Sequence, residues 1–266
     1  MMSKRKALMP DVFKRRKRVR VGGLVRPTPS SPQWGSDNEE HISAAVPSDT
    51  KAAIMYLCSL FPKQMYEGRI PPIIMKHQLY SVVKNKTLVD RQLNDLRNAH
   101  EVKMMKLGNE VDEYCLVFTE DYKNHIATFY GQELSKTVER FLEDVVSRTN
   151  EMCVTQQIMT DHNFTDVEIT QLVNAGVLTV RDLGSWWLAI PGAGLFVKHF
   201  TKGKKAVLAS IRKSKYKEIL KQELESRKMT ASVKLGMSYH IHDIIGGDLV
   251  TCIETTSGEL LRLKDD

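Results

Sequence analysis

The sequence predicts a mainly α-helical chain with small β-hairpins, an α+β protein, on two observations. Apolar residues recur at helical spacing and then give way to short alternating segments with a Gly at the turn. This pattern occurs twice at a constant offset, so that Asp166 repeats Asp90 and Gly184 repeats Gly108. An internal repeat constrains the architecture before any single residue is interpreted.

Three helices followed by a two-stranded hairpin, in about 75 to 90 residues, make a winged helix, whose commonest ligand is duplex DNA. The 266 residues have room for three such units after an N-terminal arm. We therefore expect three tandem winged-helix domains after a disordered basic arm. The expected boundaries are 1–46 for the arm, 47–131 for the first winged helix, 132–200 for the second and 201–266 for the third.

The N-terminal arm lacks apolar periodicity and contains a Pro/Ser/Gly stretch at 27–36. Such a segment cannot bury enough surface to offset its ordering entropy, so we expect it to be disordered. Two basic clusters in it resemble a nuclear localisation signal, which predicts a nuclear protein. The alternatives are a solubilising tail and an arm that also touches phosphates. The clusters comprise Lys4, Arg5, Lys6, Lys14, Arg15, Arg16, Lys17 and Arg18.

The first unit is expected to begin with a helix capped by Ser48 or Asp49. Pro71-Pro72 predicts the start of a second helix, and a capping box from Thr87 to Asp90 predicts the third. Alternating segments at 102–107 and 114–118 predict the hairpin, or wing.

The second unit is expected to start with a helix from Ser135 and a short helix near 155–159. Thr165 and Glu168 form a capping box for its third helix, which Gly176 ends. Its wing is expected at 178–183 and 186–190. Alternation along this strand sends one of Trp186 and Trp187 inward and the other outward, where a neighbouring unit covers it or a partner protein contacts it.

The third unit shows a weaker pattern. A helical stretch at 204–228 is expected to break within the polar segment 212–217. A further helix is expected at 239–249. Segments 251–254 and 259–263, joined around Ser257-Gly258, predict a closing hairpin.

Positive charge is concentrated in two blocks. Residues 1–26 hold ten Lys/Arg and one acid, and residues 198–228 hold eleven Lys/Arg and three acids, whereas the whole chain has a net charge of +7. The rest of the chain is therefore acidic. Such segregation of charge indicates a partner, and duplex DNA fits because Lys and Arg neutralise phosphates.

The second basic block supplies the predicted DNA-binding residues. The helix that usually reads bases has no Lys or Arg in the second unit, at 166–174, so we expect it not to read DNA and consider it a protein-binding face by elimination. The corresponding helix of the first unit is close to neutral. We therefore expect salt-sensitive binding dominated by the DNA backbone. The predicted site comprises Lys198, Lys202, Lys204, Lys205, Arg212, Lys213, Lys215, Lys217, Arg227 and Lys228.

No catalytic site, cofactor site or metal site is expected. Asp182-Leu183-Gly184 imitates one protein-kinase motif, but the sequence has no H-R-D and its glycines follow this motif instead of preceding it, so a hairpin turn explains it better. His240 and His242 point to different helix faces, and we expect them to be solvated or capping.

Other site classes are excluded in the same way. The four cysteines lie far apart, which favours buried reduced thiols over zinc. A membrane-spanning helix needs roughly 20 consecutive apolar residues, and no apolar run approaches that length, so no membrane segment is expected.

Several longer segments resemble vertebrate members of the family named serine/threonine-protein kinase 19, and the resemblance covers nearly the whole chain. The most specific segments are 118–122, 172–182, 184–189 and 255–258. The resemblance implies a nuclear tandem winged-helix protein that binds DNA and acts in transcription-coupled nucleotide excision repair at stalled RNA polymerase II. It also implies that Arg212, Arg227 and Lys228 contact DNA.

The implied partners are the Cockayne-syndrome ubiquitin ligase receptor, the ultraviolet-sensitivity scaffold protein and the helicase-bearing general transcription factor. A homodimer is also compatible with the sequence. Two alternatives stay open: a protein kinase, as the family name says, and a protein-interaction scaffold that never touches DNA. The N-terminal arm departs most from the family pattern, so only its basic character transfers.

Overall fold

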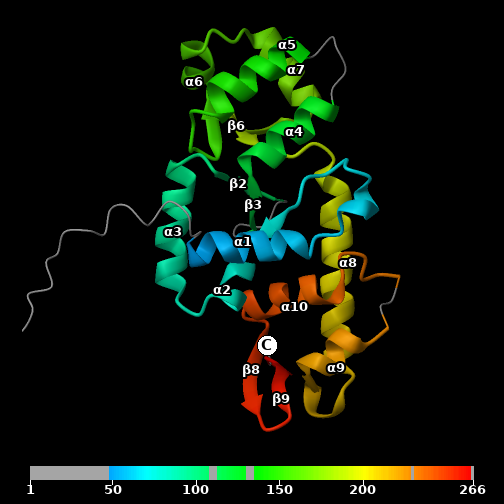
Figure 1. Ribbon diagram of the computed structural model, residues 1–266. Coiled ribbons are helices and arrows are strands. Elements are labelled where there is room, and N and C mark those ends of the chain that lie inside the picture. The colour runs from blue at the N-terminus through cyan, green and yellow to red at the C-terminus, as the bar shows by residue number, and fades with distance from the viewer. Residues whose placement is uncertain (1–47, 108–112, 130–134, 229–230, 265–266) are drawn as a thin grey trace, which may run out of the picture. The chain divides into compact units, whose positions relative to one another are not determined.

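The computed structural model describes residues 48–107, 113–129, 135–228 and 231–264. The basic clusters of the arm lie outside these residues. The expected fold class is confirmed, because helices alternate with small antiparallel sheets (Figure 1). The described helices are α1 (Asp49–Ser59), α2 (Leu79–Val82), α3 (Lys86–Asn98), α4 (Thr119–Phe129), α5 (Ser135–Arg140), α6 (Gln156–Asp161), α7 (Asp166–Asn174), α8 (Ala193–Arg212), α9 (Lys221–Ser226) and α10 (Met237–Gly246).

Three-stranded antiparallel sheets occur three times along the described chain, with strand orders β1-β3-β2, β4-β6-β5 and β7-β9-β8. In each sheet the last two strands form one of the expected hairpins. The strands are β1 (Ile74–Met75), β2 (Val102–Lys106), β3 (Tyr114–Phe118), β4 (Cys153–Thr155), β5 (Leu178–Asp182), β6 (Ser185–Leu188), β7 (Glu218–Leu220), β8 (Val250–Thr255) and β9 (Gly258–Leu263).

Local signals placed several helices correctly. The Ser48 side chain caps α1 by accepting a hydrogen bond from the Lys51 N–H. Thr165 and Glu168 form the expected capping box of α7, and Gly176 follows that helix with a φ of +74°. Each signal works within one helical turn, so no distant contact is needed for it to act.

Other expectations were wrong. Pro71-Pro72 precedes strand β1 and not a helix, and Asn85 caps α3 in place of Thr87 by accepting from the Leu88 N–H. The sequence interpretation also missed α4 and the three first strands of the sheets. Strands of two or three residues are too short to show an alternating pattern.

Helix α8 begins at Ala193 and runs for 20 residues, well before the expected helical start at 204. It passes without a break through the expected boundary at residue 200. Its first half contributes Phe196 and Phe200 to one hydrophobic core, and its second half contributes Val207 and Ile211 to another. The helix therefore stabilises two adjacent parts of the fold at once.

The described residues from 48 onward belong to one compact unit with three core clusters. One cluster surrounds the first sheet, one the third, and the largest joins the second sheet to the first sheet and to helices α8 and α10 through residues such as Cys115, Phe196 and Tyr239. None of the described helices combines the length and apolar character that crossing a membrane needs.

Helix α10 packs against α2, α8, α9 and β8, lies between α1 and the β8–β9 hairpin in Figure 1, and buries eight of its ten residues. The Tyr239 hydroxyl donates a 2.8 Å hydrogen bond to the Ile73 carbonyl, and the Gln78 amide donates to the Tyr239 carbonyl at 3.0 Å. His240 and His242 are buried here, so the expectation of solvated or capping histidines was wrong. Tertiary packing, which local spacing does not encode, decides their burial.

The cysteines divide into two groups. Cys58 and Cys115 are buried free thiols, and burial raises the pKa of each to about 12. Cys153 is half-buried and Cys252 is exposed, so the expectation of uniformly buried thiols was wrong for these two. Cys252 lies on β8, which has exposed residues along most of its length.

Candidate nucleic-acid interface

Helix α8 has a basic face and an apolar face, and no acidic residue occurs between Ala193 and Arg212. At about 100° per residue, Lys198, Lys202, Lys205 and Arg212 fall within an arc of about 80°. Their side chains are exposed, whereas Phe196, Phe200, Gly203, Val207 and Ile211 lie buried on the opposite side. The basic residues are therefore directed to solvent by the burial of the apolar ones.

The chain continues this basic surface after α8. Lys213 follows the helix as its C-cap residue, and Lys215 and Lys217 lie in a tight turn before β7. Tyr216 and Lys217 both have left-handed backbone, with φ of 60° and 55°. Non-glycine residues rarely adopt this conformation, so the turn is held by the surrounding structure, and it presents Tyr216 and both lysines to solvent.

Arg227 joins α9 to the same surface. Its guanidinium donates to the Ser210 hydroxyl on α8 at 2.8 Å and pairs with Glu223 at 2.9 Å. Lys228, the next residue, is exposed. A turn, strand β7 and helix α9 separate Arg212 from Arg227 in the sequence. The hydrogen bond from Arg227 to Ser210 nevertheless holds the end of α9 against the last turns of α8.

Lys204 differs from the other nine predicted residues. Its ammonium group lies 3.3 Å from the buried carboxylate of Asp243 and 4.4 Å from the centre of the Phe200 ring. Its side chain is only 23% exposed. It is therefore committed to an internal ion pair, and we exclude it from the surface that we call the α8 face. That surface comprises Lys198, Lys202, Lys205, Arg212, Lys213, Lys215, Lys217, Arg227 and Lys228.

One neighbouring cation escaped the sequence interpretation. Burial lowers the pKa of His199, and the positive charges of Lys234, Lys198 and Lys202 lower it further. Lys234, which is exposed, therefore lies close enough to the start of the α8 face for its charge to act there. Lys234 follows the basic block at 198–228 in the sequence, so the charge density of that block did not indicate that Lys234 takes part in this surface.

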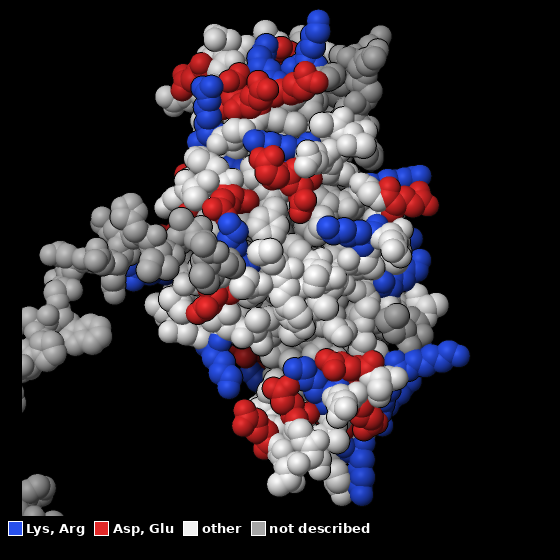
Figure 2. All heavy atoms as spheres, viewed as in Figure 1, with Lys and Arg blue, Asp and Glu red and all other residues white. Residues whose placement is uncertain are grey.

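Acids near the α8 face are largely paired. Glu223 pairs with Arg227, and Glu218 pairs with Arg262. Figure 2 shows Lys and Arg gathered along the edge of the molecule where α8 and the segment leading to α9 run in Figure 1. The nine cations of the α8 face therefore outnumber the acids beside them.

The helices that precede each hairpin are poorly suited to enter a DNA groove. Helix α10 is buried, and α7 has no Lys or Arg among its nine residues. On α3, Asp90 pairs with Lys76 at 3.0 Å, and Arg97 donates to the Asn150 carbonyl at 3.0 Å. Arg91 is exposed, but exposed Asp95 follows one helical turn later. The α8 face is the stronger site for an anionic polymer.

The residues whose sequence pattern resembled a catalytic or metal-binding motif have structural roles in the fold. Asp182-Leu183-Gly184 forms the turn between β5 and β6, as expected, with Leu183 fully exposed and Gly184 at a φ of +71°. His242 bonds the Ser81 hydroxyl at 2.8 Å and the Tyr56 hydroxyl at 3.3 Å. In the described part of the chain, no group of three or more His, Cys, Asp or Glu side chains is placed to hold a metal ion.

Sequence comparisons give one family. The family model described as "Inactive serine-threonine protein kinase 19" matches residues 44–263. "Winged helix repair factor 1" of Homo sapiens is 43% identical and covers 98% of each chain. The Xenopus laevis protein of the same name is 45% identical over 82% of this chain and 84% of its own length.

A more distant relative carries a different name. "Serine/threonine-protein kinase mug51" of Schizosaccharomyces pombe is 22% identical over 74% of this chain and 68% of its own. The match to the family model spans most of the sequence, and the human relative matches nearly all of it. The chain belongs to the inactive serine-threonine protein kinase 19 family.

Proposed function

We propose that this protein is a nuclear, non-enzymatic adaptor that binds duplex DNA through the α8 face. The observation that carries the proposal is the α8 helix itself, which has four exposed basic residues on one arc and no acid over 20 residues. Surface helices normally mix both signs of charge. An unmixed positive face is suited to the phosphates of a duplex, which carry one charge in about 1.7 Å of its length.

The size of the face agrees with this role. Lys198, in the second turn of α8, and Arg212, its last residue, lie about 21 Å apart along a helix that rises about 1.5 Å per residue. Phosphates on one DNA strand follow one another at about 3.4 Å of rise, so the face spans about six of them. The α8 face offers mainly Lys side chains, which neutralise phosphates without reading bases, so we expect little sequence preference.

We propose further that each three-stranded sheet and its helices form a winged helix, and that the three occur in tandem. The repeated strand order and the helix, strand, helix, helix, hairpin sequence in each part support this assignment. In this arrangement α8 is the first helix of the third winged helix. The third helix, which usually reads bases, is α10, whose burial explains why DNA binding would shift to α8.

We place this activity in DNA repair. The human and Xenopus laevis relatives bear the name winged helix repair factor, and the segments at 172–182 and 184–189 resemble the family associated with transcription-coupled nucleotide excision repair. The proposed partners are those of stalled RNA polymerase II: the Cockayne-syndrome receptor, the ultraviolet-sensitivity scaffold and the helicase of the general transcription factor. The acidic helix α7 is a candidate surface for one of them.

The proposal excludes protein-kinase activity. Support comes from the hairpin turn formed by Asp182-Leu183-Gly184 and from the family's description as inactive. A radioactive phosphotransfer assay on highly purified protein tests this point. Activity that copurifies with the chain and is lost in single Lys variants would favour the kinase alternative.

DNA binding is tested by fluorescence anisotropy with a labelled 24-base-pair duplex. Charge reversal by Arg212→Glu and neutralisation by Lys228→Gln should each weaken binding and lower the slope of log affinity against log salt by about 1 per cation removed, whereas Arg227→Gln should have a smaller effect because Arg227 already pairs with Glu223. A matched control carries Lys84→Gln and Lys136→Gln, two exposed lysines away from α8. Wild-type affinity in all three variants at moderate salt would support the protein-scaffold alternative.

The same titration divides the electrostatic contribution between the arm and the folded part. Full-length protein is compared with protein lacking residues 1–46. If the α8 face carries the affinity, the shorter protein keeps most of its salt slope, and Arg212→Glu reduces binding in both forms. An effect of Arg212→Glu only in the full-length protein would contradict the site assignment.

A further inference from the structure

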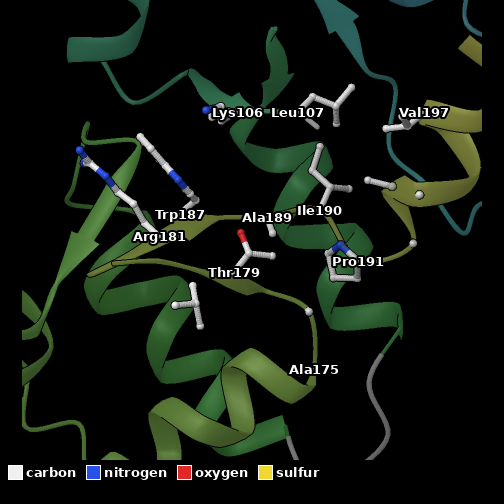
Figure 3. Close-up of a pocket in the computed structure, with 15 residues that line it drawn as sticks. Lys106, Leu107, Ala175, Thr179, Arg181, Trp187, Ala189, Ile190, Pro191 and Val197 are labelled. Carbon is white, nitrogen blue, oxygen red and sulfur yellow. The ribbon is translucent and has the colours of Figure 1, made fainter. Parts of the chain in front are cut away.

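A hollow of about 850 Å³ lies where β2, the β5–β6 hairpin and the start of α8 meet (Figure 3). Lys106 on β2 and Arg181 on β5 are the charged residues among its described lining, and no carboxylate is found in that lining. Its volume is in the range of ordinary ligand sites. We call this hollow the Trp187 pocket, after the aromatic residue between the two cations.

Trp187 has cations over its ring from two strands. The Arg181 guanidinium lies 4.6 Å from the ring centre and the Lys106 ammonium lies 5.7 Å from it. Figure 3 shows the indole between the two side chains. Because both cations already lie over the ring, it is poorly placed to stack a nucleic-acid base. The Arg181 Nε pairs with the Asp182 carboxylate, which lies outside the described lining, at 3.2 Å, so a peptide carboxylate is expected to pair with the terminal guanidinium nitrogens of Arg181 and with Lys106.

The rest of the lining suits a peptide. Ile190 and Val197 give an apolar surface, and the start of α8 adds Gly192 and Gly194. An added Cβ at Gly194 would meet open space, and no side chain caps this end of the helix. The Ala193 and Leu195 N–H groups already donate to the Ile190 and Gly192 carbonyls, so this end of the helix favours negative charge mainly through the positive end of its dipole.

Strand β5 provides a backbone edge beside the pocket. The order β4-β6-β5 makes β5 an edge strand, and Thr179, Val180 and Arg181 are exposed on it and line the pocket. An edge strand presents unpaired backbone groups to which an extended peptide can add. A peptide could therefore form backbone hydrogen bonds with β5 while its side chains contact the pocket.

We propose that the Trp187 pocket binds a short, extended, acidic segment of a partner protein. The segment adds along β5, its carboxylates pair with Arg181 and Lys106, and an apolar side chain packs against Ile190 and Val197. The argument for this occupant is charge complementarity, since the described lining has two cations and no acid. The lining adjoins the start of the α8 face but shares no residue with it, so the proposal does not depend on the proposed DNA binding.

Selection from a phage-displayed library of random twelve-residue peptides on the full-length protein tests the proposal. The enriched peptides are made with a fluorescein label, and their affinities are measured by anisotropy. We expect net-negative sequences with apolar residues. Neutralisation by Lys106→Gln with Arg181→Gln should weaken their binding at least tenfold, whereas the control pair Lys84→Gln with Lys136→Gln should leave it unchanged.

Duplex affinity and the unfolding temperature of the Lys106→Gln/Arg181→Gln protein should equal those of the wild type, which separates this site from the α8 face. If the double variant is less stable, Arg181→Gln alone, at an exposed position, replaces it, with Arg181→Lys expected to keep most of the affinity. The proposal is overturned if no acidic peptides are enriched or if they bind the variant as well as the wild type. It is also overturned if a labelled twelve-nucleotide poly-dT strand, and no peptide, depends on these two residues.

Discussion

His77 and Asp243 are far apart in the sequence, yet their Nε2 and Oδ1 atoms lie 2.6 Å from each other. The second carboxylate oxygen of Asp243 lies 3.3 Å from the Lys204 ammonium. Asp243 is completely buried on α10, so this carboxylate joins α8, α10 and the turn before α2. The relationship explains why Lys204, inside a basic block, faces inward.

Removal of this carboxylate should be costly. Asp243→Ala leaves Lys204 without its counter-ion in a mostly buried site, which typically costs about 3 kcal/mol. The free energy of unfolding from urea titration measures the loss. Asp248→Asn is the control, because it removes a carboxylate that pairs with Lys86 and Lys264 at an exposed site and keeps a residue suited to the left-handed backbone there, so it should cost less than about 1 kcal/mol. Equal losses in the two variants would contradict this view of Asp243.

Adjacent lysines on α8 should have different roles. Lys205→Gln should weaken duplex binding and reduce its salt slope by about 1, with no change in stability. Lys204→Gln should lower the unfolding temperature and leave the salt slope unchanged, because its charge is already paired with Asp243. Anisotropy against salt and thermal unfolding on the same two proteins measure both effects. Identical salt slopes for the two variants would place Lys204 in the DNA site after all.

Stability should fall in mild acid. Burial lowers the pKa of both His240 and His242 to about 4, with smaller effects from Asp243 and Lys204 on His240 and from Lys221 and Glu259 on His242. The unfolded chain, with an ordinary histidine pKa of about 6.5, binds more protons between these values. Stability is therefore complete above a pH of about 6.5 and is lost as the pH falls toward 4.

Each histidine should contribute about 1.4 kcal/mol per pH unit within that window. Urea unfolding at a series of pH values from about 7.5 to about 4.5 measures the slope. His242→Gln keeps a hydrogen-bonding side chain near Ser81 and should flatten the slope by about one proton. His162→Gln, at the end of α6, is the control and should leave it unchanged. A stability that is flat across the window is the contradicting result.

Gly203 should resist a substitution that usually favours helices. It lies in the middle of α8, and a Cβ there would clash with the His240 ring. Gly203→Ala should destabilise by about 1 to 3 kcal/mol, as overpacked sites do. Gly194→Ala, where the new methyl meets open space, should instead stabilise by about 0.5 to 1 kcal/mol. A double variant with His240→Ala should recover part of the Gly203→Ala loss, and no recovery would rule out the clash as the cause.

Much of the local structure was predictable from short segments. The capping box of α7, the end of that helix at Gly176 and the three hairpins depend on residues within a few positions of one another. The strands β1, β4 and β7 were missed because two or three residues show no pattern. They become strands because the hairpin of each sheet offers them an edge to pair with.

The predicted basic block at 198–228 likewise has features that the sequence revealed and features that only the structure revealed. Its charge and the break after Arg212 could be read from the chain, because both are local properties. The inward position of Lys204, the contact between Arg227 and Ser210 and the approach of Lys234 could not. Each of these depends on which element packs beside α8.

The sequence by itself therefore determined the repeated helices and hairpins, the segregation of charge and the lack of kinase motifs, since all three are properties of composition and short-range spacing. Only the tertiary structure decided that α10 is buried against α2 and α8 and that the basic residues of α8 share one exposed arc. It also decided that Lys106 and Arg181 meet at Trp187. Burial and long-range contact depend on the packing of distant segments, and local sequence patterns do not specify that packing.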